Sequence, residues 1–502
     1  MTVDRLTALE ASFVWFERPG VPIQVGAVAT FEAAPLLDGR GQLRLADLRD
    51  RIDARLDALP RLRRRLAPVP FDLDRPRWVD DPDFDIASHV GEIRLPAPGD
   101  DAALRRLAGD LQGRMLPRDR PLWDLRFVTG LSGDRVGLVE RIHHALVDGV
   151  SGVELATLLL DLDPDAPAPP PPPPWSPPRP PDPLSLFAAG LRDRLSEPMR
   201  AARAVADLAL HPSRAARAAA TVAQGVGTMV DEGLLAPRTS LNAPLAGGRR
   251  LAWVRGRLDD VRAAGRAAEA SVNDVVLTAV AGGLRWLFLE RGERLPPGLE
   301  LKVLVPVSLH RADEHGTLGN RVSAIYAPLP VGIGDPQARL AAVARSMRRL
   351  KSRPEADSMG LVLDAANVLP AGAARLIARA VEHQRFVNLV VTNVPGPPVP
   401  LYAGGARMLE AFPVVPLDAN LTVGVAVLSY DGALTITLTA DDLVCPDVDV
   451  FAAGIERSLA QLGVAAAEPR RAAARVARSC CSAPDRSGPG AGPTPLAART
   501  PA

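Results

Sequence analysis

The sequence predicts an α/β (α+β) fold divided into two lobes. The 502-residue length is too great for one ordinary hydrophobic core. Short apolar, β-branched runs alternate with segments of helical spacing, a pattern typical of helices layered on sheets. A proline-rich run at residues 164–183 separates two well-patterned regions. With 47% hydrophobic and 23% charged residues, most of the chain is expected to be globular.

The first lobe is expected over residues 1–163. It begins with a short apolar segment, and three strands and two helices then follow in mixed order. In chain order these are the apolar segment 6–16, strand 23–31, helix 45–59, helix 104–116, and strands 125–128 and 136–142. The second helix is indicated by apolar side chains at positions 104, 107, 108, 111 and 115, which share one helical face.

Two connecting segments follow. Residues 164–183 are mostly proline, which favours extended polyproline geometry and predicts a stiff linker; a ligand for proline-recognition domains is the less favoured alternative. Residues 184–239 are expected to form a helical connector, with arginines among alanines and leucines over 184–235. That pattern fits a solvated helix packed on the domain body, or a basic amphipathic helix on an anionic lipid surface.

The second lobe is expected over residues 240–465. Its predicted strands span 301–307, 387–391, 421–428 and 434–439, and its predicted helices span 272–289 and 336–351. Residues 466–502 are low-complexity Ala, Pro, Gly, Ser and Arg, so we expect a disordered tail.

Charge and cysteine content exclude some classes of protein. A formal net charge of +1 argues against a dedicated nucleic-acid binder. Three cysteines, two of them adjacent in the tail, cannot form a disulfide framework, which fits a reducing compartment. The N-terminus lacks the pattern of a signal peptide, and we expect no apolar run of the roughly 20 residues that span a bilayer. We therefore expect a cytoplasmic protein, either soluble or attached to a surface.

The most informative motif is HHxxxDG at residues 143–149, between a predicted strand and a predicted helix. It contains His143, His144, Asp148 and Gly149. An imidazole has an unperturbed pKa of roughly 6.5, which suits proton transfer near neutrality. A histidine in the second position, held by a nearby aspartate, is the arrangement expected of a base that deprotonates a hydroxyl. The glycine fits a tight turn or a close backbone approach.

An ordered set of further motifs accompanies this heptapeptide. They are Pro121-Leu122-Trp123, Ser240-Leu241-Asn242-Ala243-Pro244-Leu245, Asn273-Asp274-Val275-Val276, Pro306-Val307-Ser308, Gly319-Asn320, Thr392-Asn393-Val394-Pro395-Gly396-Pro397 and Ser429-Tyr430-Asp431-Gly432. Together they resemble the bacterial wax ester synthase/diacylglycerol acyltransferase family over roughly residues 5–465. HHxxxDG alone is less specific, because chloramphenicol acetyltransferase-like enzymes and peptide-synthetase condensation domains share it.

The resemblance implies two chloramphenicol acetyltransferase-like lobes with mixed sheets and an active-site tunnel at their interface. It also implies transfer of a long-chain acyl group from acyl-CoA to diacylglycerol or a long-chain alcohol, giving triacylglycerol or wax ester. Acyl-CoA is then a co-substrate and no separate cofactor is expected. A metal site is not expected either, because the remaining histidines are scattered along the chain.

Each catalytic candidate has an expected role. We expect His144 to be the general base for direct attack by the acceptor hydroxyl, since no serine or cysteine nucleophile is apparent. His143 is expected to position the loop, and Gly149 to shape it. By resemblance, Asp148 pairs with an arginine and holds that loop. Asn273, at the start of a predicted helix, resembles the family asparagine near the active site and could donate to the oxyanion.

Five further residues are candidates for substrate binding: Pro121, Leu122, Trp123, Asn242 and Asn393. For the first three, a place in the core and tunnel wall is favoured over direct action, and for Asn393 a structural turn is favoured. Asp274 is expected to cap its helix.

Two other functions remain open at this stage. One is a condensation-type acyltransferase that uses another donor or acceptor, and the other is a non-catalytic lipid-surface protein that keeps the fold. Because the expected substrates partition into lipid, attachment to a lipid droplet or to the inner membrane surface is also predicted.

Overall fold

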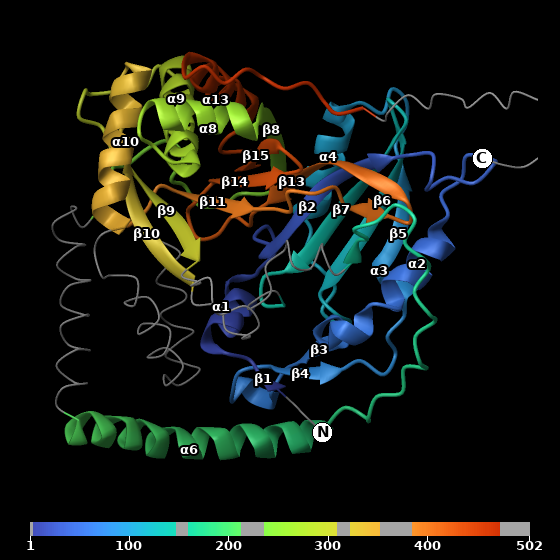
Figure 1. Cartoon of the computed structure of the whole chain (residues 1–502). Coiled ribbons are helices and arrows are strands. Elements are labelled where there is room, and N and C mark those ends of the chain that lie inside the picture. The colour runs from blue at the N-terminus through green and yellow to red at the C-terminus, as the bar shows by residue number, and fades with distance from the viewer. Residues whose placement is uncertain (1–3, 147–158, 212–234, 309–321, 352–383, 472–502) are drawn as a thin grey trace, which may run out of the picture. The chain divides into compact units, whose positions relative to one another are not determined.

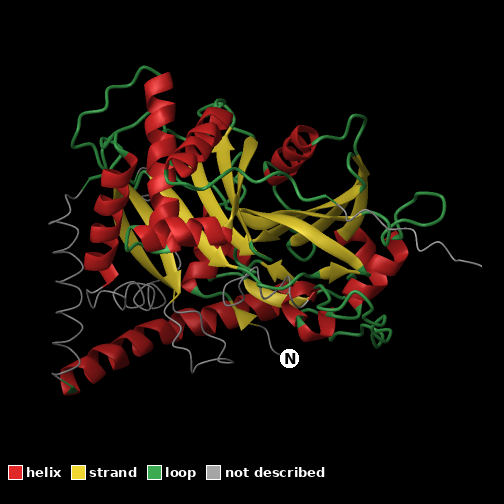
Figure 2. Ribbon diagram, turned by 45° about the horizontal axis from the view of Figure 1, so that its top comes forward, coloured by secondary structure: helices red, strands yellow, loops and turns green. Residues whose placement is uncertain are grey.

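The computed structural model describes residues 4–146, 159–211, 235–308, 322–351 and 384–471. Within these residues it contains two six-stranded mixed sheets and one three-stranded sheet, with helices packed against them (Figure 1; Figure 2). The predicted α/β (α+β) class is confirmed, because both large sheets combine parallel and antiparallel strand pairs.

The first six-stranded sheet carries the strand that ends at the histidine pair. Its strand order is β12 (Tyr402–Ala403), β13 (Ala406–Val414), β2 (Gln24–Glu32), β7 (Arg135–His143), β6 (Trp123–Leu131) and β5 (Val90–Arg94). Only β5 and β6 run parallel; the other neighbours are antiparallel. Strand β7 is therefore central, with β2 on one side and β6 on the other.

The second six-stranded sheet is built from later parts of the chain. Its order is β10 (Val322–Leu329), β9 (Leu301–Ser308), β11 (Leu389–Pro395), β14 (Val423–Tyr430), β15 (Ala433–Asp441) and β8 (Arg249–Arg257). The three central strands β9, β11 and β14 are parallel. The three-stranded sheet has the order β1 (Asp4–Arg5), β4 (Arg77–Asp80) and β3 (Arg64–Ala67).

Nine α-helices and three short 3-10 helices lie in the described residues. The α-helices are α1 (Ala8–Phe16), α2 (Leu45–Asp53), α3 (Ile86–His89), α4 (Asp101–Gln112), α6 (Pro183–Leu210), α8 (Leu258–Ala267), α9 (Val272–Glu290), α10 (Pro336–Lys351) and α13 (Val448–Gln461); the 3-10 helices are η1 (Leu56–Ala58), η2 (Pro60–Arg63) and η3 (Pro70–Asp72). The helix expected over 45–59 is therefore wrong in its second half, because Pro60 starts a separate 3-10 turn after α2 has ended.

Helix α9 forms the centre of the core beneath the second sheet. Thirteen of its residues are buried, and α10 and α13 pack against it. Among the described residues it is the one helix long and apolar enough to cross a membrane, which the sequence analysis did not expect. Because 67% of the relevant window is buried inside the protein, we assign α9 to the core.

The two large sheets are joined by an exchange of chain segments. Strand β13, which lies in the region expected to form the second lobe, pairs with β2 of the first sheet, with Ala411 opposite Ala29. Helix α4 from the first region packs on β8 of the second sheet. Between them the rings of Trp253 and Phe412 stack at 4.2 Å. Sheet membership therefore does not follow chain order.

The proline-rich segment contacts the protein body through Trp175. The indole Nε1 donates a hydrogen bond to the Asp81 carbonyl at 2.7 Å, and the Arg63 guanidinium lies 5.0 Å from the ring centroid. One side chain thus attaches an otherwise donor-poor segment.

A partly buried arginine, 14% exposed, joins the two sheets. Arg255 of β8 donates to Glu410 of β13 at 2.6 Å and to Asp101 of α4, also at 2.6 Å. Glu410 is only 4% exposed. Removing one partner from a buried ion pair leaves an uncompensated charge, which is far costlier than losing an exposed pair.

We expect Arg255→Met to lower the free energy of unfolding by about 3–5 kcal/mol, because the Glu410 carboxylate stays buried without its partner. The control Arg257→Met removes an exposed arginine from the same strand, 3.9 Å from Asp260, and should cost about 1 kcal/mol or less. Chemical denaturation measures both. Adding Glu410→Gln to Arg255→Met should restore part of the loss; equal effects of the two arginine variants would contradict this role of Arg255.

Candidate active site

The backbone of the histidine pair is fixed on both sides by the first sheet. His143 is the last residue of β7, and its N–H donates to the Leu122 carbonyl at 2.9 Å. The next N–H, that of His144, donates to the Ile23 carbonyl at 3.0 Å. Leu122 and Ile23 directly precede β6 and β2, so the two flanking strands together fix the backbone from which the imidazoles project.

The His143 imidazole is held as a neutral ring. It is fully buried, and its Nδ1 accepts a hydrogen bond from the Ala145 N–H at 3.1 Å. Because Nδ1 is an acceptor, the proton of the neutral ring lies on Nε2. Burial, with the nearby positive charge of Arg118 and the neighbouring His144, lowers the pKa of His143 to about 3.

A buried carboxylate faces that Nε2 proton. Glu17 follows α1, its side chain is 1% exposed, and its Oε1 lies 3.7 Å from His143 Nε2. Its Oε2 accepts from Arg118 Nη2 at 2.9 Å and from Nε at 3.2 Å. No sequence motif indicates either residue as part of the site. Each is a charged residue beside an apolar segment, and only the fold shows that they meet at His143.

The His144 imidazole has a different environment. Its ring stacks on Phe13 of α1, with centroids 4.1 Å apart and planes 13° from parallel. Its Nδ1 atom is buried without a hydrogen-bond partner among the described residues, and burial lowers its pKa below the ordinary value. His144 is therefore neutral near pH 7, the form in which an imidazole can accept a proton.

Asp148 and Gly149, with the predicted helix after them, lie outside the described residues. Their expected roles in shaping the loop stay predictions.

Pro121, Leu122 and Trp123 support the histidines from within the core. All three are buried, and the Leu122 carbonyl binds the His143 N–H as described above. Trp123 donates from Nε1 to the Leu62 carbonyl at 2.6 Å and stacks on His89 at 4.5 Å. A contact with substrate stays a prediction for this tripeptide.

Asn273 and Asn393 come together from distant parts of the chain. Asn393 Nδ2 donates to Asn273 Oδ1 at 3.4 Å, which leaves the Asn273 Nδ2 group free of that bond. Asn273 lies in the first turn of α9, where Ser271 and Asp274 form a capping box, so the predicted capping role of Asp274 is confirmed. This turn carries the positive end of the helix dipole.

The end of β11 packs against the apolar cluster that also contains the residues after the histidine pair. Val394, next to Asn393, packs against the apolar cluster that contains Ala145 and Leu146. The cluster also takes Leu428 and Tyr430 from the end of β14. The carboxyl ends of two parallel strands of the second sheet thus meet the same core as the residues directly after His144.

Asn242 lies elsewhere. Its Nδ2 donates to the Asn388 carbonyl at 3.0 Å, and its Oδ1 accepts from Asn388 Nδ2 at 2.7 Å. Asn388 precedes β11, five residues before Asn393, which corresponds to about 16 Å along an extended strand. Asn242 therefore joins the connector to the opposite end of β11, and its contact with substrate stays a prediction that these bonds do not favour.

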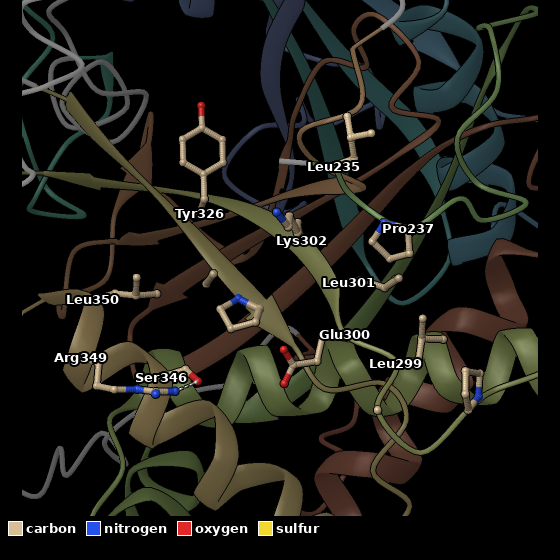
Figure 3. A pocket seen from close by; sticks show the side chains of 14 residues that line it. Leu235, Pro237, Leu299, Glu300, Leu301, Lys302, Tyr326, Ser346, Arg349 and Leu350 are labelled. Carbon is tan, nitrogen blue, oxygen red and sulfur yellow. Dashed lines mark hydrogen bonds between the residues drawn. The ribbon is translucent and has the colours of Figure 1, made fainter. Parts of the chain in front are cut away.

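One cavity lies apart from the histidines. It has a volume of about 780 Å³ and lies at the start of β9, the end of β10 and the second half of α10, with Lys302, Tyr326 and Arg349 in its lining (Figure 3). Because β9 and β11 run parallel, this is the end of the sheet that holds Asn388. A smaller cavity of about 390 Å³ is lined by Glu17, Arg118, Val14 and Trp15, beside the His143 environment.

Glu140 is a further ionisable group on β7. Its strand neighbours are Ala27 and Leu125, and burial alone raises the pKa of its carboxyl group to about 7. Strand alternation places it on the face of β7 that also carries Ile142, toward the apolar cluster. The sequence analysis missed Glu140 because an acid within a strand is usually solvent-facing.

Comparison of the structure with solved proteins defines its class. The starter condensation domain of rhizomide synthetase, solved as a mutant with C8-CoA, superposes with a TM-score of 0.51 at 14% identity, covering 90% of this chain and 94% of that one. The chain thus has the two-lobed fold of condensation domains. The wax ester synthase/diacylglycerol acyltransferase from Marinobacter aquaeolei superposes better, with a TM-score of 0.64 at 25% identity and coverage of 91% and 98%.

The sequence places the chain more narrowly. Residues 6–276 match the wax ester synthase/diacylglycerol acyltransferase catalytic domain, and residues 318–463 match the C-terminal domain of the same family. A probable diacylglycerol O-acyltransferase of Mycobacterium tuberculosis is 34% identical over 467 residues, which are 92% of this chain and 96% of the relative. The protein belongs to the wax ester synthase/diacylglycerol acyltransferase family.

Glu140→Gln should stabilise the protein at and above pH 7. Because the folded-state pKa of Glu140 is raised to about 7 from 4.5, folding takes up a proton between these pH values. The burial cost of the charged form therefore grows as pH rises through that window and is fully present above it. The expected gain is about 1–3 kcal/mol at pH 8 and close to none at pH 4.

Denaturation of both proteins at a series of pH values measures this difference. Glu32→Gln, on the neighbouring strand β2, is the control and should show no such window. A gain for Glu140→Gln that is independent of pH would contradict the assignment.

Proposed function

We propose that the protein transfers a long-chain acyl group from acyl-CoA to the hydroxyl of diacylglycerol or a long-chain alcohol, forming triacylglycerol or wax ester. The observation that carries this proposal is the neutral His144, fixed at the end of β7 in a chain of this family. The names of its relatives support the same chemistry.

In the proposed step, His144 acts as general base. Since Nδ1 is buried, Nε2 is the nitrogen that takes the proton as the acceptor oxygen attacks the thioester carbonyl. The new C–O bond forms, the C–S bond then breaks, and the proton passes to the departing CoA thiolate. General-base catalysis of this kind contributes on the order of 10²–10⁴ in rate.

The oxyanion of the tetrahedral intermediate needs hydrogen-bond donors. We assign this part to Asn273, whose Oδ1 is occupied by Asn393 and whose Nδ2 is thereby oriented as a donor. The N-terminus of α9 adds a favourable field at the same place.

The test is release of free CoA from palmitoyl-CoA, measured in parallel with hexadecanol and dipalmitoylglycerol. The wild-type protein should release CoA in proportion to ester formed and only when an acceptor is present. His144→Ala should lower kcat by about 10²–10⁴-fold. Full retention of transfer by that variant would defeat the general-base assignment.

The same assay has a predicted pH dependence. Burial lowers the pKa of His144 below its ordinary value of 6.5. The midpoint of the acid limb of kcat/KM should therefore lie below pH 6.5. A limb above pH 7 would contradict this environment for His144.

Glu17→Gln should lower kcat by about tenfold with little change in KM, because the His143 ring loses the carboxylate charge that lies 3.7 Å from its Nε2 while the side-chain volume is kept. Glu32→Gln again serves as control. The unfolding midpoint should be measured beside the kinetics. If kcat falls only in step with the unfolding midpoint, and does not fall at low temperature, the role of Glu17 is structural.

A further inference from the structure

Helix α6 carries a row of apolar side chains on its outer side. Leu184, Leu191, Leu195 and Met199 are 75%, 40%, 69% and 58% exposed. Their spacing of seven, four and four residues places them on one face of a helix with 3.6 residues per turn. We call these four residues, together with Phe71, the α6 face. Figures 1 and 2 both show α6 at the margin of the ribbon.

The opposite side of α6 is fastened to the protein. Leu186 and Gly190 are buried, and a Cβ added at Gly190 would lie 2.7 Å from Val69. Asp193 pairs with Arg77 of β4. The helix is therefore held in a fixed rotation, so its apolar row faces outward because of packing on the other side.

Phe71 extends this apolar row beyond the helix. It is 91% exposed and lies in η3 with φ of 60°, a left-handed conformation that residues with a Cβ rarely adopt. Its ring meets Phe187 of α6 edge-on at 6.2 Å. An aromatic ring presented to water in this way is unusual, because large apolar side chains gain from burial.

Positive charges border the row on both sides. At about 100° per residue, Arg192 and Arg194 lie on opposite flanks of the line through Leu191 and Leu195, and both are exposed. Arg194 keeps one donor on the Leu73 carbonyl at 2.8 Å. Arginines that flank an apolar helical face match the phosphate layer of a lipid surface when that face enters the acyl region.

We propose that the α6 face docks this protein on a phospholipid-coated surface that contains anionic headgroups. This docking rests on the proposed function, because the proposed acceptors, diacylglycerol and long-chain alcohols, reside in lipid. Docking would also bring the 390 Å³ cavity close to the lipid, since Val69 and Asp72 of its lining flank Phe71 in the chain. Glu17 and Arg118 line the same cavity, on the side of His143.

The test is co-sedimentation of the full chain with vesicles of phosphatidylcholine alone and of phosphatidylcholine mixed equally with phosphatidylglycerol. The wild type should bind the mixed vesicles more tightly, and salt should weaken binding. Leu191→Glu combined with Leu195→Glu, and separately Phe71→Ser, should each lower the partition coefficient by about tenfold or more. The control is Leu443→Glu, which alters a 68% exposed leucine after β15 and should bind as wild type.

Two readouts separate the outcomes. CoA release with acceptor dispersed in detergent should be unchanged in the α6-face variants, whereas release with acceptor in vesicles should fall with binding. Unchanged vesicle binding by the variants would overturn the proposal. Light scattering that shows a dimer broken by the same substitutions would also overturn it, in favour of a second copy as the occupant.

Failure of the proposed function would look different. A wild type that binds vesicles through this face but releases no CoA would keep the docking surface and remove the reaction. A wild type that transfers acyl groups in detergent but binds no vesicles would keep the reaction and remove the docking surface.

Discussion

Two backbone hydrogen bonds at the end of β7 determine the geometry of the candidate site. The N–H groups of His143 and His144 bind carbonyls that precede the flanking strands β6 and β2, so the backbone that carries the two imidazoles is fixed by the sheet. The contacts of the two rings then differ. His143 accepts a hydrogen bond from the Ala145 N–H at Nδ1 and faces the Glu17 carboxylate at Nε2, whereas His144 stacks on Phe13. In the proposed mechanism the buried His143 ring positions the loop and His144 is the ring that reacts.

The same sheet depends on a strand from far along the chain. Strand β2, which flanks the histidine strand β7, gains β13 as its own second neighbour only after residues beyond 400 have been made. The bonds from Arg255 to Glu410 and Asp101 then connect β13 to β8 and α4.

Local patterns predicted what is local. Periodicity placed β7, α9 and α10 within a few residues, and the HHxxxDG motif lies, as predicted, at the end of a strand. Local patterns could not show that Glu17 lies beside His143, because the two residues are 126 positions apart in the sequence and no motif links them. The motif order grouped Asn242 with Asn393, but hydrogen bonds place them at opposite ends of β11. Only tertiary structure separates them.

Burial shifts the proton equilibria around β7 in one direction. It lowers the pKa values of His143 and His144 and raises that of Glu140, so all three groups favour their neutral forms. A base in such a place is ready at neutral pH, but the imidazolium formed during proton transfer meets little water to stabilise it. Among the described residues, Glu17 is a buried carboxylate beside His143, and it is paired with Arg118. In the proposed mechanism, an imidazolium with so little stabilisation would favour prompt return of its proton to the departing thiolate.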